Sequence, residues 1–101
     1  MADYRFGNSS FKNLLWINNG ALFDDVSGMD VEFMSPGAFV FRIAEASGAV
    51  KKDCPYRNEN GGWHSCDLTS LGIHSGRYKL AFVNASPGEK RIKQGVVYVR
   101  D

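Results

Sequence analysis

Apolar and polar residues alternate along several short runs of the chain, and turn-forming residues separate these runs. In the clearest run, 77–83, apolar side chains occupy every second position: Tyr78, Leu80 and Phe82. A period of two residues is that of a β-strand with one face in a core. No segment keeps the 3.6-residue period of a helix over a helical length. The pattern predicts an antiparallel all-β domain.

Six segments between the turns have the composition of strands. They are residues 30–33, 39–43, 49–53, 63–68, 77–83 and 92–100. In the second of these, Phe39, Phe41 and Ile43 are predicted to face the core. Asn18-Asn19-Gly20 between apolar runs predicts a hairpin, because these residues tolerate the positive φ of a type I′ turn. Residues 14–17 lack alternation, which fits either a strand buried on both faces or a short helical turn.

Length and composition fit one ordinary globular domain. The chain has 101 residues, of which 44% are hydrophobic and 23% are charged. We therefore predict a single domain over residues 1–101, without an internal boundary. Residues 1–10 are mostly polar, and we expect them to form an N-terminal arm outside the core.

Charge and targeting signals exclude some classes of partner. The net charge is +1, so no overall field attracts the protein to nucleic acid or to a membrane surface. The basic run Lys90-Arg91-x-Lys93 has no interleaved aromatic residues, which argues against nucleic-acid binding. The first 13 residues contain no apolar segment of a secretory signal, and no stretch reaches membrane-spanning length. We expect cytoplasmic synthesis and no membrane partner.

Two segments near the C-terminus resemble the end of immunoglobulin-like β-sandwich modules. They are Asp67-Leu68-Thr69-Ser70-Leu71 and, five residues on, Gly76-Arg77-Tyr78-Lys79-Leu80. Gly-x-Tyr is similar to the tyrosine corner of such folds, which would put Tyr78 at the start of the penultimate strand. The resemblance implies a single immunoglobulin-like antiparallel β-sandwich of about eight strands. Neither cysteine has the spacing of the immunoglobulin inter-sheet disulfide.

Two cysteines and two histidines are the candidates for metal or redox chemistry. Eleven residues separate Cys54 from Cys66, which leaves both a disulfide and a pair of free thiols open. With His64 and His74 they form the spacing Cys-x9-His-x-Cys-x7-His, whose residue types could bind zinc but whose spacing fits no common knuckle. We assign no metal and no cofactor. A Cys66–His64 pair lacks an orienting carboxylate, so we expect no enzymatic activity.

The polar loop after Cys54 is the best candidate binding site. Its residues Tyr56, Arg57 and Asn58, together with Trp63, are of the types found in adaptable contact surfaces. If Leu68 faces the core, then by alternation Trp63 faces outward. The alternative is that Trp63 belongs to the core.

These features favour a non-enzymatic structural or interaction module of a larger assembly. A bacteriophage virion component, such as a capsid decoration or tail accessory protein, fits a small domain without catalytic residues. Its partner would be another protein or further copies of itself. One alternative is a carbohydrate-binding module that uses the Tyr56–Trp63 loop on a glycan. The second is a small zinc-binding protein that uses Cys54, His64, Cys66 and His74.

Overall fold

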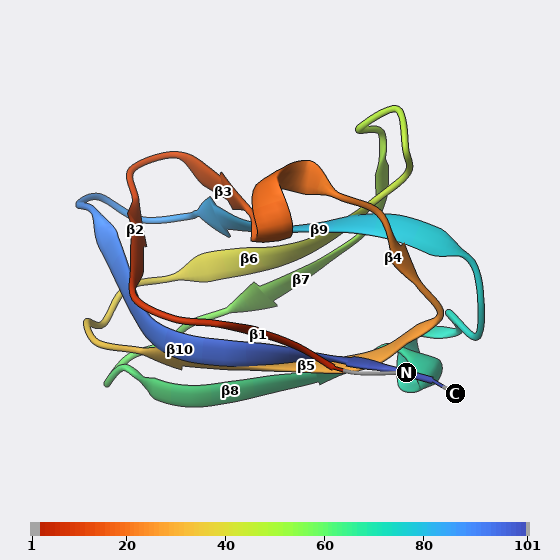
Figure 1. Cartoon of the computed structure of the whole chain (residues 1–101). Coiled ribbons are helices and arrows are strands. Elements are labelled where there is room, and N and C mark those ends of the chain that lie inside the picture. The colour runs from red at the N-terminus through yellow and green to blue at the C-terminus, as the bar shows by residue number, and fades with distance from the viewer. Residues whose placement is uncertain (1–2, 101) are drawn as a thin grey trace.

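The computed structural model describes residues 3–100, and within them the chain forms ten strands and two short 3₁₀ segments (Figure 1). The strands are β1 (Tyr4–Phe6), β2 (Ser9–Phe11), β3 (Leu14–Trp16), β4 (Phe23–Asp24), β5 (Val26–Phe33), β6 (Phe39–Ala44), β7 (Val50–Tyr56), β8 (Gly62–Asp67), β9 (Arg77–Asn84) and β10 (Lys90–Val99). The 3₁₀ segments are η1 (Ile17–Gly20) and η2 (Thr69–Leu71).

The strands form two antiparallel sheets that pack face to face. One sheet has the order β1-β10-β5-β8, and β2 also pairs with β10. The other has the order β3-β9-β6-β7, and β4 also pairs with β9. The predicted all-β sandwich is confirmed. There are ten strands where about eight were expected, because the two edges opposite β8 and β7 are each divided into two short strands.

The strand order is that of an eight-position jelly roll, in which successive strands mostly change sheet. The last two strands, β9 and β10, lie in opposite sheets. In an immunoglobulin domain the corresponding strands pair within one sheet. The antiparallel sandwich is therefore as expected, while the connections between its strands follow a different order from the one that the resemblance implied. Tyr78 does lie at the start of the penultimate strand.

The predicted N-terminal arm is wrong for the residues that the structure describes; residues 1 and 2 lie outside them. Residues 4–6 and 9–11 are strands that pair with β10. The physical reason is that two phenylalanines anchor this polar stretch. Phe11 is buried, and the ring of Phe6 lies where a Cβ on Gly95 would be.

The predicted hairpin at Asn18-Asn19-Gly20 is also wrong, although its backbone is as expected. Asn18 and Asn19 have φ angles of 52° and 54°. The flanking strands, however, both pair with β9 and not with each other. The turn connects β3 to β4, which both pair with the same edge of β9. Residues 14–17 match neither alternative fully, because the short strand Leu14–Trp16 is only partly buried and runs directly into the 3₁₀ segment that begins at Ile17.

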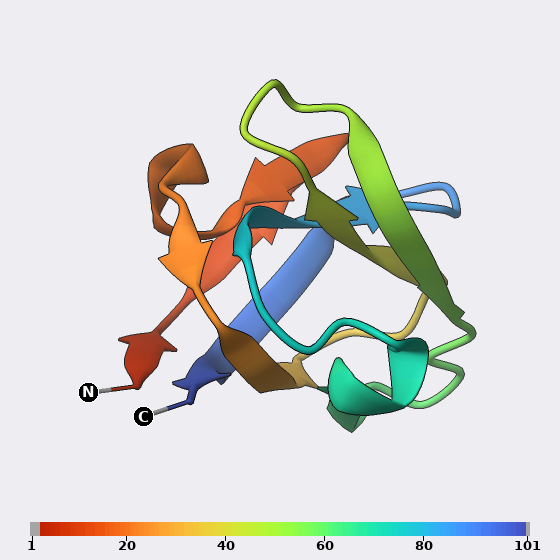
Figure 2. The same cartoon turned by 90° about the vertical axis from the view of Figure 1, so that its right-hand side faces the viewer.

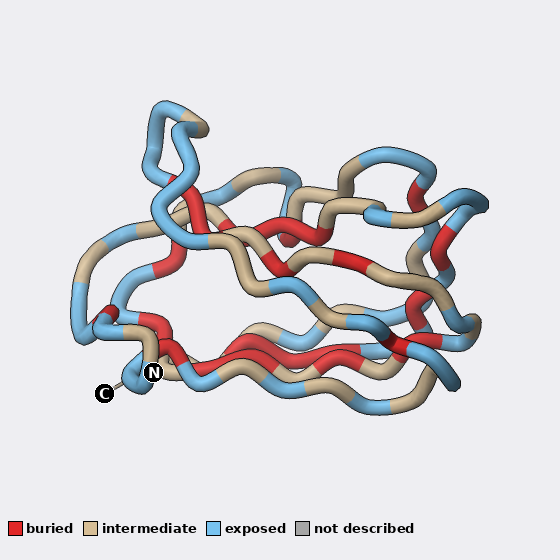
Figure 3. Tube along the Cα trace, turned by 180° about the vertical axis from the view of Figure 1, so that it is seen from behind, coloured by how far each residue is buried: buried red, intermediate tan, exposed pale blue. Residues whose placement is uncertain are grey.

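The core lies between the sheets and is rich in phenylalanine. Buried residues follow the inner faces of both layers (Figure 3). Phe39, Phe41 and Ile43 all face this core, as predicted. The η2 segment lies at one end of the sandwich, seen end-on in Figure 2. Lys90 is only 1% exposed, so the basic run 90–93 does not form one continuous surface patch.

Candidate functional site

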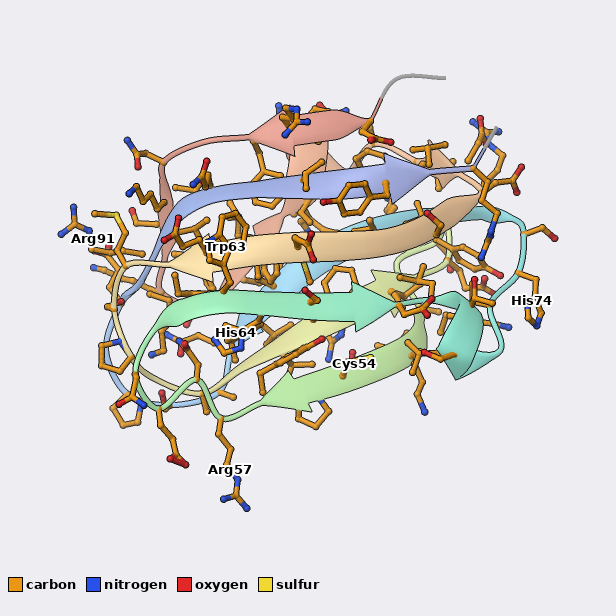
Figure 4. The ribbon with its side chains drawn as sticks, turned by 90° about the horizontal axis from the view of Figure 1, so that it is seen from below. Cys54, Arg57, Trp63, His64, His74 and Arg91 are labelled. Carbon is orange, nitrogen blue, oxygen red and sulfur yellow. The ribbon has the colours of Figure 1, made fainter. Side chains whose placement is uncertain are left out.

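Trp63 lies on the outer face of the β8–β5–β10 sheet and is 55% exposed (Figure 4). Its neighbours on β8, His64 and Cys66, are partly buried and pack toward the core. The predicted outward direction of Trp63 is therefore confirmed. It follows from strand alternation, because His64 and Cys66 on β8 are partly buried, and Leu68, directly after the strand, is buried.

Tyr56 does not belong to this outer surface, contrary to the sequence interpretation. Its ring stacks on Phe39 at a centroid distance of 4.8 Å with 7° between the planes. Its hydroxyl donates a hydrogen bond of 2.7 Å to the carbonyl oxygen of Ser65. Burial raises the pKa of Tyr56, and the nearby thiols raise it further. The residue joins β7 to β8 and therefore has a structural role.

Asn58 is a buried structural residue as well, because it is only 3% exposed. Its Nδ2 donates hydrogen bonds of 3.1 Å to the carbonyl oxygens of Ser35 and Gly37. Its Oδ1 lies 2.7 Å from Nε2 of His64. Its φ of 50° suits asparagine, which tolerates the left-handed region. The side chain holds the loop 57–61 against the turn 35–37.

Arg57 is exposed, but it extends away from Trp63 (Figure 4). The four residues of the predicted loop site thus do not form one surface. Tyr56 and Asn58 point inward, whereas Arg57 and Trp63 are exposed in different directions. Of the four, Arg57 and Trp63 remain accessible to a partner, and Trp63 is the one large apolar side chain among the exposed pair.

The structure surrounds Trp63 with polar residues that the sequence analysis did not connect to it. Trp63 is the cross-strand neighbour of Glu32 on β5, and Glu32 is opposite Gln94 on β10. Nε2 of Gln94 donates a hydrogen bond of 2.8 Å to Oε1 of Glu32. Because residues 30–33 alternate, Glu32 faces outward and its two neighbours on the strand face the core. The sequence did not reveal the order of the strands, and this order decides which residues lie beside Glu32.

A second polar group lies two residues further along the same face. The hydroxyl of Tyr98 donates a hydrogen bond of 2.6 Å to Oδ2 of Asp30, and Ser65 donates to Oδ1. The hydrogen bond to Asp30 raises the pKa of Tyr98. The Tyr98 ring packs beside Gly28, where a Cβ would lie 3.8 Å from Cδ2. We call this surface the Trp63 face, and it consists of Asp30, Glu32, Trp63, Ser65, Gln94 and Tyr98.

The predicted zinc ligands do not converge. Within residues 3–100, no group of three or more histidine, cysteine, aspartate or glutamate side chains is placed to hold a metal ion. Nε2 of His64 is hydrogen-bonded to Oδ1 of Asn58, and burial lowers the pKa of His64. His74 is exposed at the opposite end of the sandwich (Figure 4).

Cys54 and Cys66 are free thiols, and they line the same open cleft between β7 and β8. Burial raises the pKa of the Cys66 thiol to about 12, with Cys54 as the next largest cause. Such a thiol is a poor nucleophile at neutral pH, because the thiolate is the reactive form. The cleft therefore lacks an activated catalytic cysteine at Cys66.

No protein-family model, curated protein or solved structure matches the chain. Over residues 3–100, the structure contains no helix with the length and apolar character needed to span a membrane.

Proposed function

We propose that the chain is a non-enzymatic interaction module that binds a neutral carbohydrate through the Trp63 face. The observation that carries this proposal is the exposed Trp63 beside the hydrogen-bonded pair of Glu32 and Gln94. A ligand site of this kind combines an aromatic platform with a few polar groups that fix orientation. The site differs from the loop that the sequence suggested, although it keeps Trp63.

The indole of Trp63 suits the apolar side of a sugar. A pyranose ring presents C–H groups on its faces and hydroxyl groups around its rim. The indole offers a large apolar surface with a negative π face, which attracts the partly positive C–H hydrogens. Trp63 stands on a strand, so its position is better defined than that of a loop side chain.

The polar residues of the face suit the sugar hydroxyls. An ionised carboxylate has about four acceptor sites. Glu32 accepts one side-chain hydrogen bond, from Gln94, and Asp30 accepts two, from Tyr98 and Ser65. Both carboxylates therefore keep capacity to accept from a ligand. Charge-assisted hydrogen bonds of this kind are stronger than neutral ones.

The negative charge of the two carboxylates restricts the class of ligand that the Trp63 face can bind. Asp30 and Glu32 place two carboxylates on the central strand of the face. Negative groups repel phosphate, sulfate and uronate groups at short range. Arg5 on β1, the strand that pairs with β10, acts on Tyr98 with the opposite sign. The preference for a neutral oligosaccharide over an acidic one therefore applies to the part of the face beside Trp63 and Glu32.

The jelly-roll fold is compatible with carbohydrate binding but does not by itself indicate it. Jelly-roll sandwiches occur both in lectin domains and in viral capsids, and a fold alone does not give a function. A role in a larger assembly, for instance a bacteriophage virion, stays a prediction. A protein partner on the Trp63 face would be the competing outcome of the test.

The test uses the fluorescence of Trp63. The chain has two tryptophans, and the second is Trp16, whose ring centroid lies 5.8 Å from Nζ of Lys79. A Trp16→Phe variant leaves Trp63 as the single tryptophan, so its fluorescence reports on Trp63 alone. We expect a saturable change in emission with at least one of a panel of neutral β- and α-linked glucose, xylose, mannose and galactose oligosaccharides. Isothermal titration calorimetry on the unmodified chain then gives the affinity.

Two variants separate binding from folding. Trp63→Ala is expected to abolish the heat of binding in isothermal titration calorimetry, whereas Val50→Ala, which removes an exposed apolar side chain from the other sheet, leaves it unchanged. Glu32→Gln should weaken binding several-fold, by roughly 1 kcal/mol for one charge-assisted hydrogen bond. Absence of binding to every oligosaccharide would overturn the proposal. Trp63-dependent self-association in native mass spectrometry would instead support the assembly function.

A further inference from the structure

The two sheets meet along one side of the sandwich at β7 and β8, which are edge strands of opposite sheets. No backbone ladder joins these two strands in the described structure, because β7 pairs with β6 and β8 pairs with β5. One side-chain link crosses the gap, from the Tyr56 hydroxyl to the Ser65 carbonyl oxygen at 2.7 Å. Along their lengths, β7 and β8 are therefore held together by side-chain contacts, and the loop 57–61 joins them at one end.

Cys54 and Cys66 face each other across the same gap. Cys54 lies on β7 two residues before Tyr56, and Cys66 follows Ser65 on β8. Both side chains are partly buried, pack against the core and line one cleft. The pKa of the Cys66 thiol responds to the Cys54 thiol, which is consistent with two side chains that line the same cleft. Their opposition results from tertiary structure, since 11 residues and a loop separate them in the chain.

We propose that Cys54 and Cys66 form a reversible disulfide that staples the edge of one sheet to the edge of the other. The oxidant is a low-molecular-weight disulfide such as oxidised glutathione. This modification is independent of the carbohydrate proposal, because neither thiol belongs to the Trp63 face.

The reaction is two thiol–disulfide exchanges. The thiolate of Cys54 attacks one sulfur of the reagent, forms a mixed disulfide and releases one glutathione thiolate. Cys66 then loses its proton and attacks the Cys54 sulfur, which forms the Cys54–Cys66 bond and releases the second glutathione. The two protein thiols give up two electrons, and the two protons end on the two released thiols. The second exchange requires the thiolate of Cys66, whose pKa burial raises, so this step accelerates with rising pH.

The bond would stabilise the fold. It would close a ring that contains the loop 57–61 and would restrict the unfolded chain. A ring of this size is expected to raise the melting temperature by roughly 10–15 °C. A reductant should reverse the change.

The experiment treats the purified full-length protein with oxidised glutathione at increasing ratios to reduced glutathione. We expect the intact mass to fall by about 2 Da, the two hydrogens lost on closure. Trypsin should yield peptides 53–57 and 58–77 joined together, because it cuts after Lys52, Arg57 and Arg77. The melting temperature should rise in the same samples and return with dithiothreitol.

Cys54→Ser and Cys66→Ser are matched controls whose melting temperatures should not respond to the oxidant. If either variant fails to fold, the peptide map of the unmodified chain still decides. Stable addition of two glutathiones, or two thiols that remain available to alkylation at the most oxidising ratio, would overturn the proposal. A disulfide between two copies of the chain would overturn it equally.

Discussion

Nε2 of His64 lies 2.7 Å from Oδ1 of Asn58, and the surroundings of Asn58 determine which atom carries the proton. The Nδ2 group of Asn58 faces the carbonyl oxygens of Ser35 and Gly37, which can only accept. Oδ1 is therefore the acceptor toward the histidine, and Nε2 of His64 is the donor. This pair fastens the loop 57–61 to β8, the strand that also carries Trp63 on its opposite face.

This relationship predicts a loss of stability in mild acid. Burial lowers the pKa of His64 in the folded state, so the unfolded state takes up a proton more readily. The free energy of unfolding should keep its full value above about pH 6.5, the ordinary histidine pKa. It should decrease as the pH falls from there toward the lowered folded-state pKa. Urea unfolding between about pH 7.5 and about pH 5 measures this slope.

The control for this slope is the second histidine. His64→Gln should reduce the pH dependence, whereas His74→Gln should retain it, because His74 is exposed. Equal slopes for the unmodified chain and His64→Gln would contradict the assignment.

Replacement of Asn58 is expected to affect stability and not ligand contact. Asn58→Ala removes three hydrogen bonds from a buried side chain and leaves the two carbonyl oxygens without that donor. We expect a loss of roughly 2–4 kcal/mol in the free energy of unfolding. Asn60→Ala, at an exposed position of the same loop, should change it by less than about 0.5 kcal/mol. Similar effects of both variants in chemical denaturation would show that Asn58 does not anchor the loop.

Gly95 is expected to tolerate no side chain while Phe6 is present. A Cβ at Gly95 would lie 2.2 Å from Cζ of Phe6, so the Phe6 ring would have to move. Gly95→Ala should destabilise by about 1–3 kcal/mol. Gly7→Ala is the matched control, since nothing lies within 4 Å of its Cβ position.

A double variant checks the cause of the Gly95 effect. Phe6→Ala removes the ring, so the cost of Gly95→Ala should become much smaller in that background. Strictly additive costs in thermal unfolding would exclude a clash with Phe6 as the cause.

Lys90 is expected to organise the loop between β9 and β10. It is 1% exposed, and its Nζ donates to the carbonyl oxygens of Ser86, Pro87 and Gly88 at 3.2, 3.4 and 3.0 Å. Lys90→Met keeps most of the buried chain but loses these bonds, at a cost of about 1–3 kcal/mol. Hydrogen exchange should accelerate in residues 85–89. Lys93→Met, at an exposed position, should leave the free energy of unfolding and the exchange rates unchanged. An equal effect of Lys93→Met and Lys90→Met would show that Lys90 does not organise this loop.

The sequence by itself determined the strand character of the chain and the direction of many side chains. Alternation placed Phe39, Phe41 and Ile43 in the core and Trp63 outside, because a strand sends successive side chains to opposite faces whatever it pairs with. The positive φ of Asn18 and Asn19 was equally local and was also foreseen.

Only the tertiary structure decided which strands are neighbours. The placement of β5 between β10 and β8 brings Gln94 and Glu32 to Trp63, and the meeting of β7 and β8 brings Cys54 to Cys66. Pairing between distant strands leaves no mark in local periodicity, because each strand would show the same alternation beside another partner. The burial of Asn58 was hidden for the same reason: a polar loop residue becomes a core residue only when distant carbonyl groups and a histidine surround it.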